Sequence, residues 1–324
     1  MIAVIGSTNL DTVMRVGHLT EAGETSSAKG IKQYLGGKGA NQAIGVAKLN
    51  SECCFFTSIG NDWAGRFLSK KLSEFNINLY VRSSNDLSGQ AFIEVSDEGL
   101  NKIIIYSGAN GDLYENFIFE NSEVIEKAGI ILLQGEIPWD TNLYILEKYK
   151  KSHCVILDPA PANVEMLAGM GEATYITPNE TEFSILTGRQ YDSLDQMIAA
   201  ANSFQKRLGA KLILKLGENG CAYFSDSESF LVSPVRNLKV VDTTGAGDSF
   251  NSAFAVALER GESIKNSIKY AVLASGISTM REGTSSAMPT NEEVLVFQKE
   301  FGENQPELIE LEGAEKYLEH LRKQ

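Results

Sequence analysis

Short apolar runs alternate with helix-like patterns along most of this chain. Each run has the length of one buried strand, and the segments between them show helical spacing. Strands are expected at 2–6, 53–59, 130–134, 154–157, 174–176, 211–215 and 220–224. Helices are expected at 38–49, 62–75, 139–150, 179–187, 193–208, 246–260, 263–281 and 290–301, with a further acidic helix at 306–322. This alternation predicts an α/β protein with a largely parallel sheet that helices cover on both faces.

Two segments interrupt the alternation. Residues 12–35 contain strand-like pieces and turns, and residues 88–107 contain the strand-like runs Gln90–Val95 and Lys102–Tyr106 around a turn. Both runs carry clustered or alternating apolar side chains. A small sheet with two exposed faces is not stable alone, so we expect it to cover an active site or a partner subunit. The predicted division is a core of residues 1–11, 36–87 and 108–324, and a lid of residues 12–35 and 88–107.

The composition limits the classes of partner. The chain has 324 residues, 43% of them hydrophobic, and a formal net charge of −13. This length fits one large α/β domain, alone or with a small appendage, and the acidic balance argues against a nucleic-acid partner. We see no targeting leader and no run of membrane-span length, so we expect a cytoplasmic protein with no membrane partner. The four cysteines form no Cys-x-x-Cys pair, which argues against a metal knuckle.

The segment Asp242–Phe250 predicts an anion site next to a base. A helix-forming run begins at or just after Gly245, Ala246 and Gly247. The first backbone N–H groups of this helix would have no hydrogen-bond partner. Those donors and the helix dipole attract negative charge. Asp248 stands where it could accept a proton from a hydroxyl group that attacks a phosphate. The alternative is an ordinary turn with an acidic residue in the first turn of a helix.

The segment Gly36–Gln42 is the second strong signal. Its glycines, Gly36 and Gly37 among them, let the backbone approach a ligand closely. Lys38 and Asn41 lie in the first turn of the helix that follows and offer donors to hydroxyl groups or to an anion. The pattern is not a Walker loop, because a glycine and not a serine or threonine follows the lysine. The alternative is a flexible turn that starts a helix.

Polar residues also follow several of the expected strands. Asn9 and Asp11 come directly after the first strand, and Glu136 follows the strand at 130–134. Carboxylates and amides bind polyols because they accept and donate several hydrogen bonds at once. Each of these residues has a second interpretation as part of a plain polar turn.

Two further segments follow strands and have a functional and a structural interpretation. In Thr177–Glu182, Asn179 and Glu182 could stand near a hydrated Mg²⁺ ion, but helix capping alone explains them better. Leu216–Gly220 joins two strands, either as a simple hairpin turn or as the floor of a nucleotide site.

Together these motifs resemble those of the ribokinase and PfkB-type family of sugar kinases. Gly36–Gln42 is similar to the amino-terminal signature of the family, and Asp242–Asp248 is similar to its carboxy-terminal signature. Thr177–Glu182 resembles its magnesium-associated motif. The resemblance runs in the same order over nearly the whole chain, from Met1 to Pro289. Three more segments resemble ribokinase-type members: Gly6–Asp11, Ser107–Asn110 and Asp158–Ala162.

The resemblance implies a three-layer α/β/α kinase core with a β-sheet lid, and transfer of phosphate from ATP to the 5-hydroxyl group of D-ribose. Asp248 would be the general base, and the backbone of Gly245, Ala246 and Gly247 the anion hole. The sugar would contact Asn9, Asp11, Gly36, Gly37, Lys38, Asn41, Ala91, Ile93, Glu136 and Asp248. ATP would contact Asn179, Lys215, Gly217, Gly220, Gly245, Ala246 and Gly247. The alternatives are a kinase for another sugar or nucleoside and, more distantly, a sugar sensor without activity.

The resemblance also implies two metal ions and a homodimer. Mg²⁺ would be held near Asn179 and Glu182 through water. An activating K⁺ ion would lie near Asp242, Thr244, Glu282 and Gly283. The lid would pair two subunits. The chain departs from the family at Lys215, where a small hydroxyl residue is common, and in the acidic segment beyond Pro289.

Overall fold

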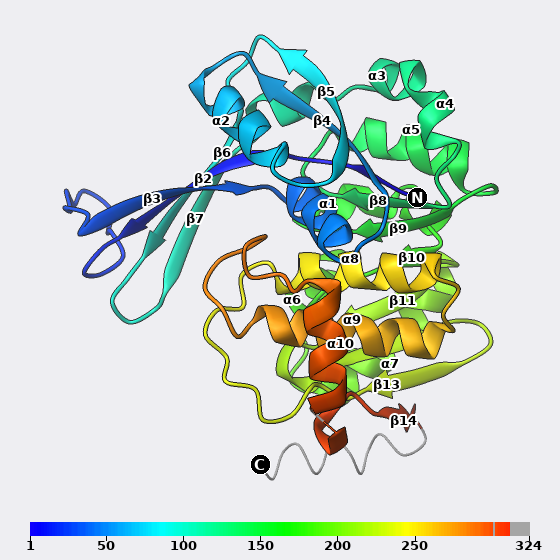
Figure 1. The fold of residues 1–324 in the computed structure, drawn as a ribbon. Helices are drawn as coiled ribbons and strands as arrows, with labels where there is room; N and C mark the ends of the chain where they lie inside the picture. Colours follow the sequence, from blue (N-terminus) through cyan, green and yellow to red (C-terminus); the bar gives the residue numbers. More distant parts are fainter. Residues whose placement is uncertain (301, 312–324) are drawn as a thin grey trace.

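The computed structural model describes residues 1–300 and 302–311, and it places them in a large sheet between two helical layers plus a smaller sheet (Figure 1). The large sheet has ten strands. In spatial order they are β14 (Leu308–Glu310), β13 (Ser229–Val232), β12 (Cys221–Phe224), β11 (Lys211–Lys215), β10 (Tyr175–Ile176), β9 (Cys154–Asp158), β8 (Ile130–Gln134), β1 (Ile2–Ile5), β4 (Cys53–Gly60) and β5 (Ile77–Ser84). The strands from β11 to β5 are parallel, and β12, β13 and β14 continue the sheet antiparallel.

Both faces of the sheet are buried, which explains the continuous apolar runs in the sequence. Along β1, Ile2 and Val4 point into one core cluster, and Ala3 and Ile5 point into the other. The first face is covered by α1 (Lys38–Lys48), α2 (Trp63–Leu72), α8 (Ala246–Glu259), α9 (Ile264–Ser278) and α10 (Asn291–Glu300). The second is covered by α3 (Glu115–Glu120), α4 (Ser122–Ile125), α5 (Trp139–Tyr149), α6 (Glu180–Thr187) and α7 (Leu194–Leu208).

The smaller sheet is the predicted lid sheet. Its strands are ordered β3 (Gly30–Gly36), β2 (Asn9–Arg15), β6 (Gly89–Val95) and β7 (Asn101–Tyr106). Figure 1 shows it projecting from one side of the core. β2 pairs in parallel with β6, which sets Asp11 opposite Ala91 and Val13 opposite Ile93. Only three residues separate the end of β1 from the start of the lid strand β2, so the lid is tied directly to the centre of the large sheet.

The predicted fold class, a mostly parallel sheet between helices with a separate lid sheet, is confirmed. The sequence analysis assigned no strand to β5, whose exposed positions weaken the apolar signal. The acidic helix expected at 306–322 is wrong in its first part, because Leu308–Glu310 pair with β13 as an edge strand. Pairing with an open sheet edge outweighs the helix propensity of such a short segment. Residues 312–322 of that prediction lie outside the described residues.

Among the described residues, no helix has the length and apolar character needed to cross a bilayer.

Candidate active site

The site is built at one edge of the large sheet, where parallel strands end and two helices begin. Gln134 ends β8, Asp158 ends β9 and Lys215 ends β11, and Lys38 is the first residue of α1. Open parallel sheets bind ligands beyond the carboxyl ends of their strands. Gly37, the residue before α1, has a φ of 91°, and a Cβ atom there would lie 2.8 Å from the backbone nitrogen of Asn9. Glycine is therefore required for α1 to begin this close to the connection between β1 and β2.

Asp248 lies in the first turn of α8 and is only 4% exposed. Its Oδ2 accepts a hydrogen bond of 3.0 Å from Asn41 Nδ2, and its Oδ1 accepts one of 3.1 Å from Gln42 Nε2. Burial raises the pKa of Asp248, while the Lys38 ammonium group and these two donors oppose the rise. The side chain is thus a fixed acceptor with a raised proton affinity, which suits a general base.

The start of α8 leaves backbone donors available. Gly245 precedes the helix with a φ of 76°, and no side chain caps the helix end. The N–H group of Ala246 already donates to the carbonyl of Thr243 at 3.2 Å. In the described chain, the N–H groups of Gly247 and Asp248 make no hydrogen bond, so they can still bind an anion. Of the predicted anion hole, the donors at Gly245 and Gly247 make no hydrogen bond among the described residues and are open to a ligand, whereas the donor at Ala246 is used.

A buried ion pair lies next to the base. Lys215 Nζ is 2.9 Å from Asp158 Oδ1, with side chains that are 13% and 2% exposed. Gln42 connects this pair to Asp248, because its Nε2 also lies 3.2 Å from Asp158 Oδ2. Gln134 Nε2 donates to Gln42 Oε1 at 2.8 Å and so fixes which end of the Gln42 amide faces the two carboxylates.

Lys38 balances the negative charge at this sheet edge. Burial by itself would lower the pKa of Lys38, but the carboxylates of Asp248, Asp158 and Glu136 raise it above its ordinary value. The ammonium group is therefore charged at every relevant pH. A fixed positive charge beside the base stabilises the ionised form of Asp248 and attracts an anionic ligand.

The predicted sugar-side residues lie where β1, β2 and β3 meet α1. Asn9 is buried, and its Oδ1 accepts a hydrogen bond of 2.7 Å from Asn110 Nδ2. Glu136 accepts hydrogen bonds from the Lys38 N–H group, at 2.9 Å, and from the Ser7 hydroxyl. Burial raises the pKa of Asp11 to about 7, and the nearby carboxylates of Glu136 and Asp248 add to the effect. These side chains form a polar wall with unused donors and acceptors.

A cleft of about 410 Å³ lies between the lid and two core loops, and Asn9, Lys38, Asn41, Glu136 and Asp248 do not line it. Asp11 and Ile93 line it from the lid strands, and Asp242, Thr244 and Gly283 line it from two core loops. Ala91 lies next to Asp11 on the adjacent strand and is buried. Arg15, at the end of β2, forms an exposed ion pair with Glu282, which joins the lid to one of those loops.

Asn179 and Glu182 form a reciprocal cap at the start of α6. Asn179 Oδ1 accepts from the Glu182 N–H group at 2.8 Å, and Glu182 Oε2 accepts from the Asn179 N–H group at 2.7 Å. This is the capping interpretation of the motif. Glu182 Oε1 has no hydrogen bond in the described chain, and burial raises the pKa of Glu182 near Lys215 and Asp158. One carboxylate oxygen thus stays available, which is enough for an ion that keeps most of its water ligands.

Asp242 holds two core loops together. Its Oδ1 accepts from the N–H and hydroxyl groups of Thr244, at 2.9 and 2.6 Å, and its Oδ2 accepts from the Gly283 N–H group at 3.0 Å. The Glu282 side chain points to Arg15 of the lid instead. Gly217 and Gly220 lie in the hairpin turn between β11 and β12, both with positive φ. The hairpin interpretation of this turn is therefore correct at the level of topology.

The comparisons with known proteins agree with this geometry. The profile described as "pfkB family carbohydrate kinase" matches residues 1–291. The ribokinase of Bacillus subtilis is 36% identical over 297 residues, which cover 90% of this chain and 97% of that protein. A deoxyribokinase of Salmonella typhimurium is 35% identical over 296 residues, covering 90% and 96%.

The chain belongs to the PfkB family of carbohydrate kinases.

Solved structures support the same conclusion for this kinase. The ribokinase of Thermotoga maritima superposes with a TM-score of 0.83 at 37% identity, over 92% of this chain and 99% of that one. The Arabidopsis thaliana ribokinase, solved with ribose and ATP, superposes with a TM-score of 0.84 at 35% identity, over 92% and 98%. This kinase therefore uses ATP to phosphorylate a carbohydrate, as the sequence analysis predicted.

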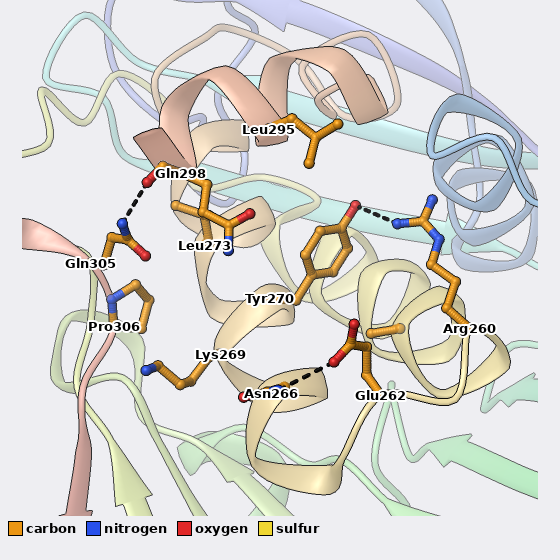
Figure 2. A pocket seen from close by; sticks show the side chains of 11 residues that line it. Arg260, Glu262, Asn266, Lys269, Tyr270, Leu273, Leu295, Gln298, Gln305 and Pro306 are labelled. Atoms are coloured by element: carbon orange, nitrogen blue, oxygen red, sulfur yellow. Dashed lines mark hydrogen bonds between the residues drawn. The ribbon is translucent and has the colours of Figure 1, made fainter. Parts of the chain in front are cut away.

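A second cavity of about 320 Å³ lies away from this edge of the kinase, between α9, α10 and the segment before β14 (Figure 2). Figure 2 shows Arg260 and Tyr270 joined by a hydrogen bond on its wall. Arg260 also donates to the carbonyl of Leu49 at 2.6 Å and to Asn291 at 2.9 Å. None of the predicted site residues line this cavity, and its arginine is engaged in joining helices. It is not the active site of the kinase.

The sequence analysis gave no role to Gln42, Asp158 or Gln134. Gln42 was quoted only as part of a glycine-rich motif, and Asp158 only as part of a segment resembling the family. The sequence did carry a signal, because Gln134 is the last residue of the expected strand at 130–134 and Asp158 directly follows the one at 154–157, so both belong to the ligand edge of the sheet. Their contacts with each other could not be read from the sequence, because they depend on which strands are neighbours.

Proposed function

We propose that this kinase phosphorylates D-ribose at its 5-hydroxyl group to give ribose 5-phosphate. The observation that carries the proposal is the buried Asp248 carboxylate, which is fixed by Asn41 and Gln42 beside the available Gly247 N–H group. In-line transfer of a phosphoryl group to a hydroxyl group requires a base next to an anion site. Several similar proteins, including those of Bacillus subtilis and Thermotoga maritima, are named ribokinase.

In this proposal Asp248 takes the proton of the 5-hydroxyl group as its oxygen attacks the γ-phosphorus. The bond to the β-phosphate oxygen breaks, and ADP leaves. The protein forms no covalent bond, so positioning and charge stabilisation dominate. The backbone at Gly245, Ala246 and Gly247 holds the transferred group, and Lys215, Gly217, Gly220 and Asn179 lie on the nucleotide side.

The sugar would occupy the polar wall below the lid. Its hydroxyl groups would bind Asn9, Asp11, Lys38, Asn41 and Glu136, and Gly36 and Gly37 give the ring room to approach the backbone. Ala91 and Ile93 of the lid would cover its apolar side. Closure of the lid would exclude water, which could otherwise accept the phosphate.

The choice of ribose over 2-deoxyribose rests on Asn9. The Oδ1 atom of Asn9 accepts a hydrogen bond from Asn110, so the Nδ2 donors of Asn9 point away from Asn110. A buried donor without a partner is costly, so the site should favour a sugar that supplies one more hydroxyl group. The deoxyribokinase relatives make 2-deoxyribose the nearest competitor.

The test is ADP release in a coupled assay with a panel of ribose, 2-deoxyribose, fructose and nucleosides. We expect the highest kcat/KM for ribose, with 2-deoxyribose at least tenfold lower. A higher value for another acceptor would replace ribose in this proposal. Absence of turnover with every acceptor would favour a sugar sensor.

We also propose that Mg²⁺ binds through water at Glu182, beside Asn179. The free Oε1 atom and the nearby Asp158 carboxylate fit a hydrated divalent cation. When bound with ATP, the ion would neutralise charge on the phosphate groups. The protein's own part is to hold Glu182 in place through the cap on α6.

An activating K⁺ ion is proposed at the loops that Asp242 joins. The side-chain oxygens of Asp242 and Thr244 and the backbone of Glu282 and Gly283 lie together next to the anion site. A cation there would order the loop before α8. We expect turnover in K⁺ buffer to exceed turnover in Na⁺ buffer by at least fivefold, and the difference should vanish in Asp242→Asn. Equal rates in the two buffers would remove the ion from the proposal.

A further inference from the structure

The Lys215 side chain has hydrogen-bonding capacity that its ion pair does not use. An ammonium group has three N–H donors. Asp158 Oδ1, at 2.9 Å, is the only acceptor of Lys215 Nζ among the described residues. The side chain is 13% exposed, so bulk water reaches it poorly. Two donors on a mostly buried cation are therefore left for a ligand.

The position of these donors is fixed by the fold. Lys215 ends β11, and its backbone N–H group donates to the Pro178 carbonyl at 2.9 Å. Its Nζ atom lies 3.3 Å from the point where a Cβ atom on Gly247 would stand. The ammonium group is thus beside the backbone that opens α8. A glycine at 247 leaves the space between the cation and the helix free.

The ion pair and the base belong to one buried network. Gln42 Nε2 lies 3.2 Å from Asp158 and 3.1 Å from Asp248, so one amide group holds both carboxylates. Asp158 in turn holds Lys215. Because these links are buried or mostly buried, the ammonium group keeps a set distance from the base and from the start of α8. An anion at that helix end would meet the lysine and the free N–H groups together.

We propose that Lys215 is a catalytic residue whose ammonium group binds oxygen atoms of the phosphoryl group during its transfer. The O5–Pγ bond forms, the bond from Pγ to the β-phosphate oxygen breaks, and the hydroxyl proton moves to Asp248. Lys215 stays protonated and exchanges no proton. It stabilises charge on the migrating group, and Asp158 and Gln42 act as positioning residues. This inference rests on the proposed anion site.

The competing explanation is structural: Lys215 could serve only to neutralise the buried Asp158 carboxylate. Removing one partner of a buried ion pair leaves an uncompensated charge, which by itself can disturb the site. The single variant Lys215→Met therefore cannot separate the two explanations. The double variant Lys215→Met/Asp158→Asn can, because it removes the lysine and the charge that the lysine neutralises.

The experiment compares wild type, Lys215→Met, the double variant and the control Lys211→Met. Lys211 is at the other end of β11, where its Nζ lies 4.9 Å from the Tyr175 ring centroid. For each protein we would measure kcat, the KM for ATP, the affinity for the sugar without nucleotide, and the melting temperature. We expect both Lys215 variants to lose at least ~10²-fold in kcat, with sugar affinity unchanged. Lys211→Met should keep the wild-type kcat.

Two results would overturn the inference. If the double variant recovers kcat to within a few-fold of wild type, the lysine is structural. If only the KM for ATP rises, the lysine binds ground state and transition state equally and is not catalytic. The variants are compared with the best acceptor of the sugar panel. A failure of ribose would therefore reject the proposed acceptor without affecting the test of Lys215.

Discussion

At the residue scale, the chemistry depends on one carboxylate that is buried and hydrogen-bonded. Asn41 and Gln42 hold Asp248 in place without blocking the start of α8. Both donors stabilise its ionised form, whereas burial favours the protonated form. The result is a base of raised proton affinity in a fixed direction.

We predict that Asp248→Asn loses ~10²–10⁴-fold in kcat, because a positioned base contributes about that factor. The amide is the same size, its oxygen can accept from Gln42, and its NH2 group can donate to the unpartnered Oδ1 of Asn41 once that amide turns, so the fold and sugar affinity should be retained. Steady-state kinetics and calorimetric sugar titration measure the two effects. Turnover within tenfold of wild type would show that Asp248 is not the base.

The sugar affinity should depend on pH through Asp11. Its pKa is raised to about 7, chiefly by burial and further by Glu136 and Asp248. A protonated carboxyl group accepts sugar hydroxyl protons poorly. Below pH 7 we therefore expect the dissociation constant of the sugar to rise by up to ~10-fold per pH unit. Titrations at pH 5.5 to 8.5 would show this, and the slope should be absent in Asp11→Asn.

The same shift affects stability with a definite sign. The folded, ligand-free protein binds the Asp11 proton more tightly than the unfolded chain does. The stabilisation that Asp11 contributes to the folded protein is therefore fully present below pH ~4 and is lost as the pH rises to 7. At pH 8 this loss lowers the free energy of unfolding by at most about 4 kcal/mol. Asp11→Asn should therefore unfold at higher urea concentration than wild type. A variant less stable than wild type at pH 8 would contradict this account.

At the element scale, the Asp11 side chain of β2 occupies the space beside Gly36 of β3. A Cβ atom on Gly36 would stand 1.9 Å from Asp11 Oδ2, whereas one on Gly30, at the other end of the same strand, would meet nothing within 4 Å. The Asp11 carboxylate can rotate away, so the cost falls on the site more than on the fold.

We therefore predict that Gly36→Ala raises the KM for the sugar by ~10–100-fold, about the value of one hydrogen bond to a charged group. Gly30→Ala, the matched control on β3, should leave it unchanged. Both variants should keep melting temperatures close to wild type. Equal kinetic effects of the two variants would indicate a general disturbance of the lid.

At the scale of the whole molecule, the lid exposes apolar side chains that a single subunit does not cover. All six residues of β7 are exposed, and Ile104, at 63%, points to the face of the lid sheet opposite to Ile103, which lines the cleft. The lid strands are joined to β1 at the centre of the core, so whatever covers them also restrains closure. We propose that a second copy of this chain covers this face and forms a homodimer.

Light scattering at micromolar concentration should give the mass of a dimer. Ile104→Glu should convert it to a monomer, because it buries a charge at the centre of the proposed contact. Phe119→Glu is the control, since Phe119 is 66% exposed on α3, away from the lid. A wild-type monomer, or loss of the dimer in both variants, would reject the lid as the interface.

The class of fold, most of the strands and helices, and the two glycine-rich motifs could be predicted from the amino-acid sequence. These features are local: a buried strand needs a short apolar run, and a helix that starts at a ligand needs small residues before it. The strands β5 and β14 were not predicted because they lie at the edges of the sheet, where pairing and not burial maintains them. The strand β13 was also not predicted, although it is buried between β12 and β14.

The contacts between the polar residues of the site depend on the assembled fold. Gln42 meets Asp158 and Asp248 across 116 and 206 positions of sequence, and Lys215 meets Asp158 across 57. Such contacts follow from the order of parallel strands, which no local pattern encodes. The raised pKa of Asp11 has the same origin, because burial and neighbouring charge are properties of the assembled site and not of the residue.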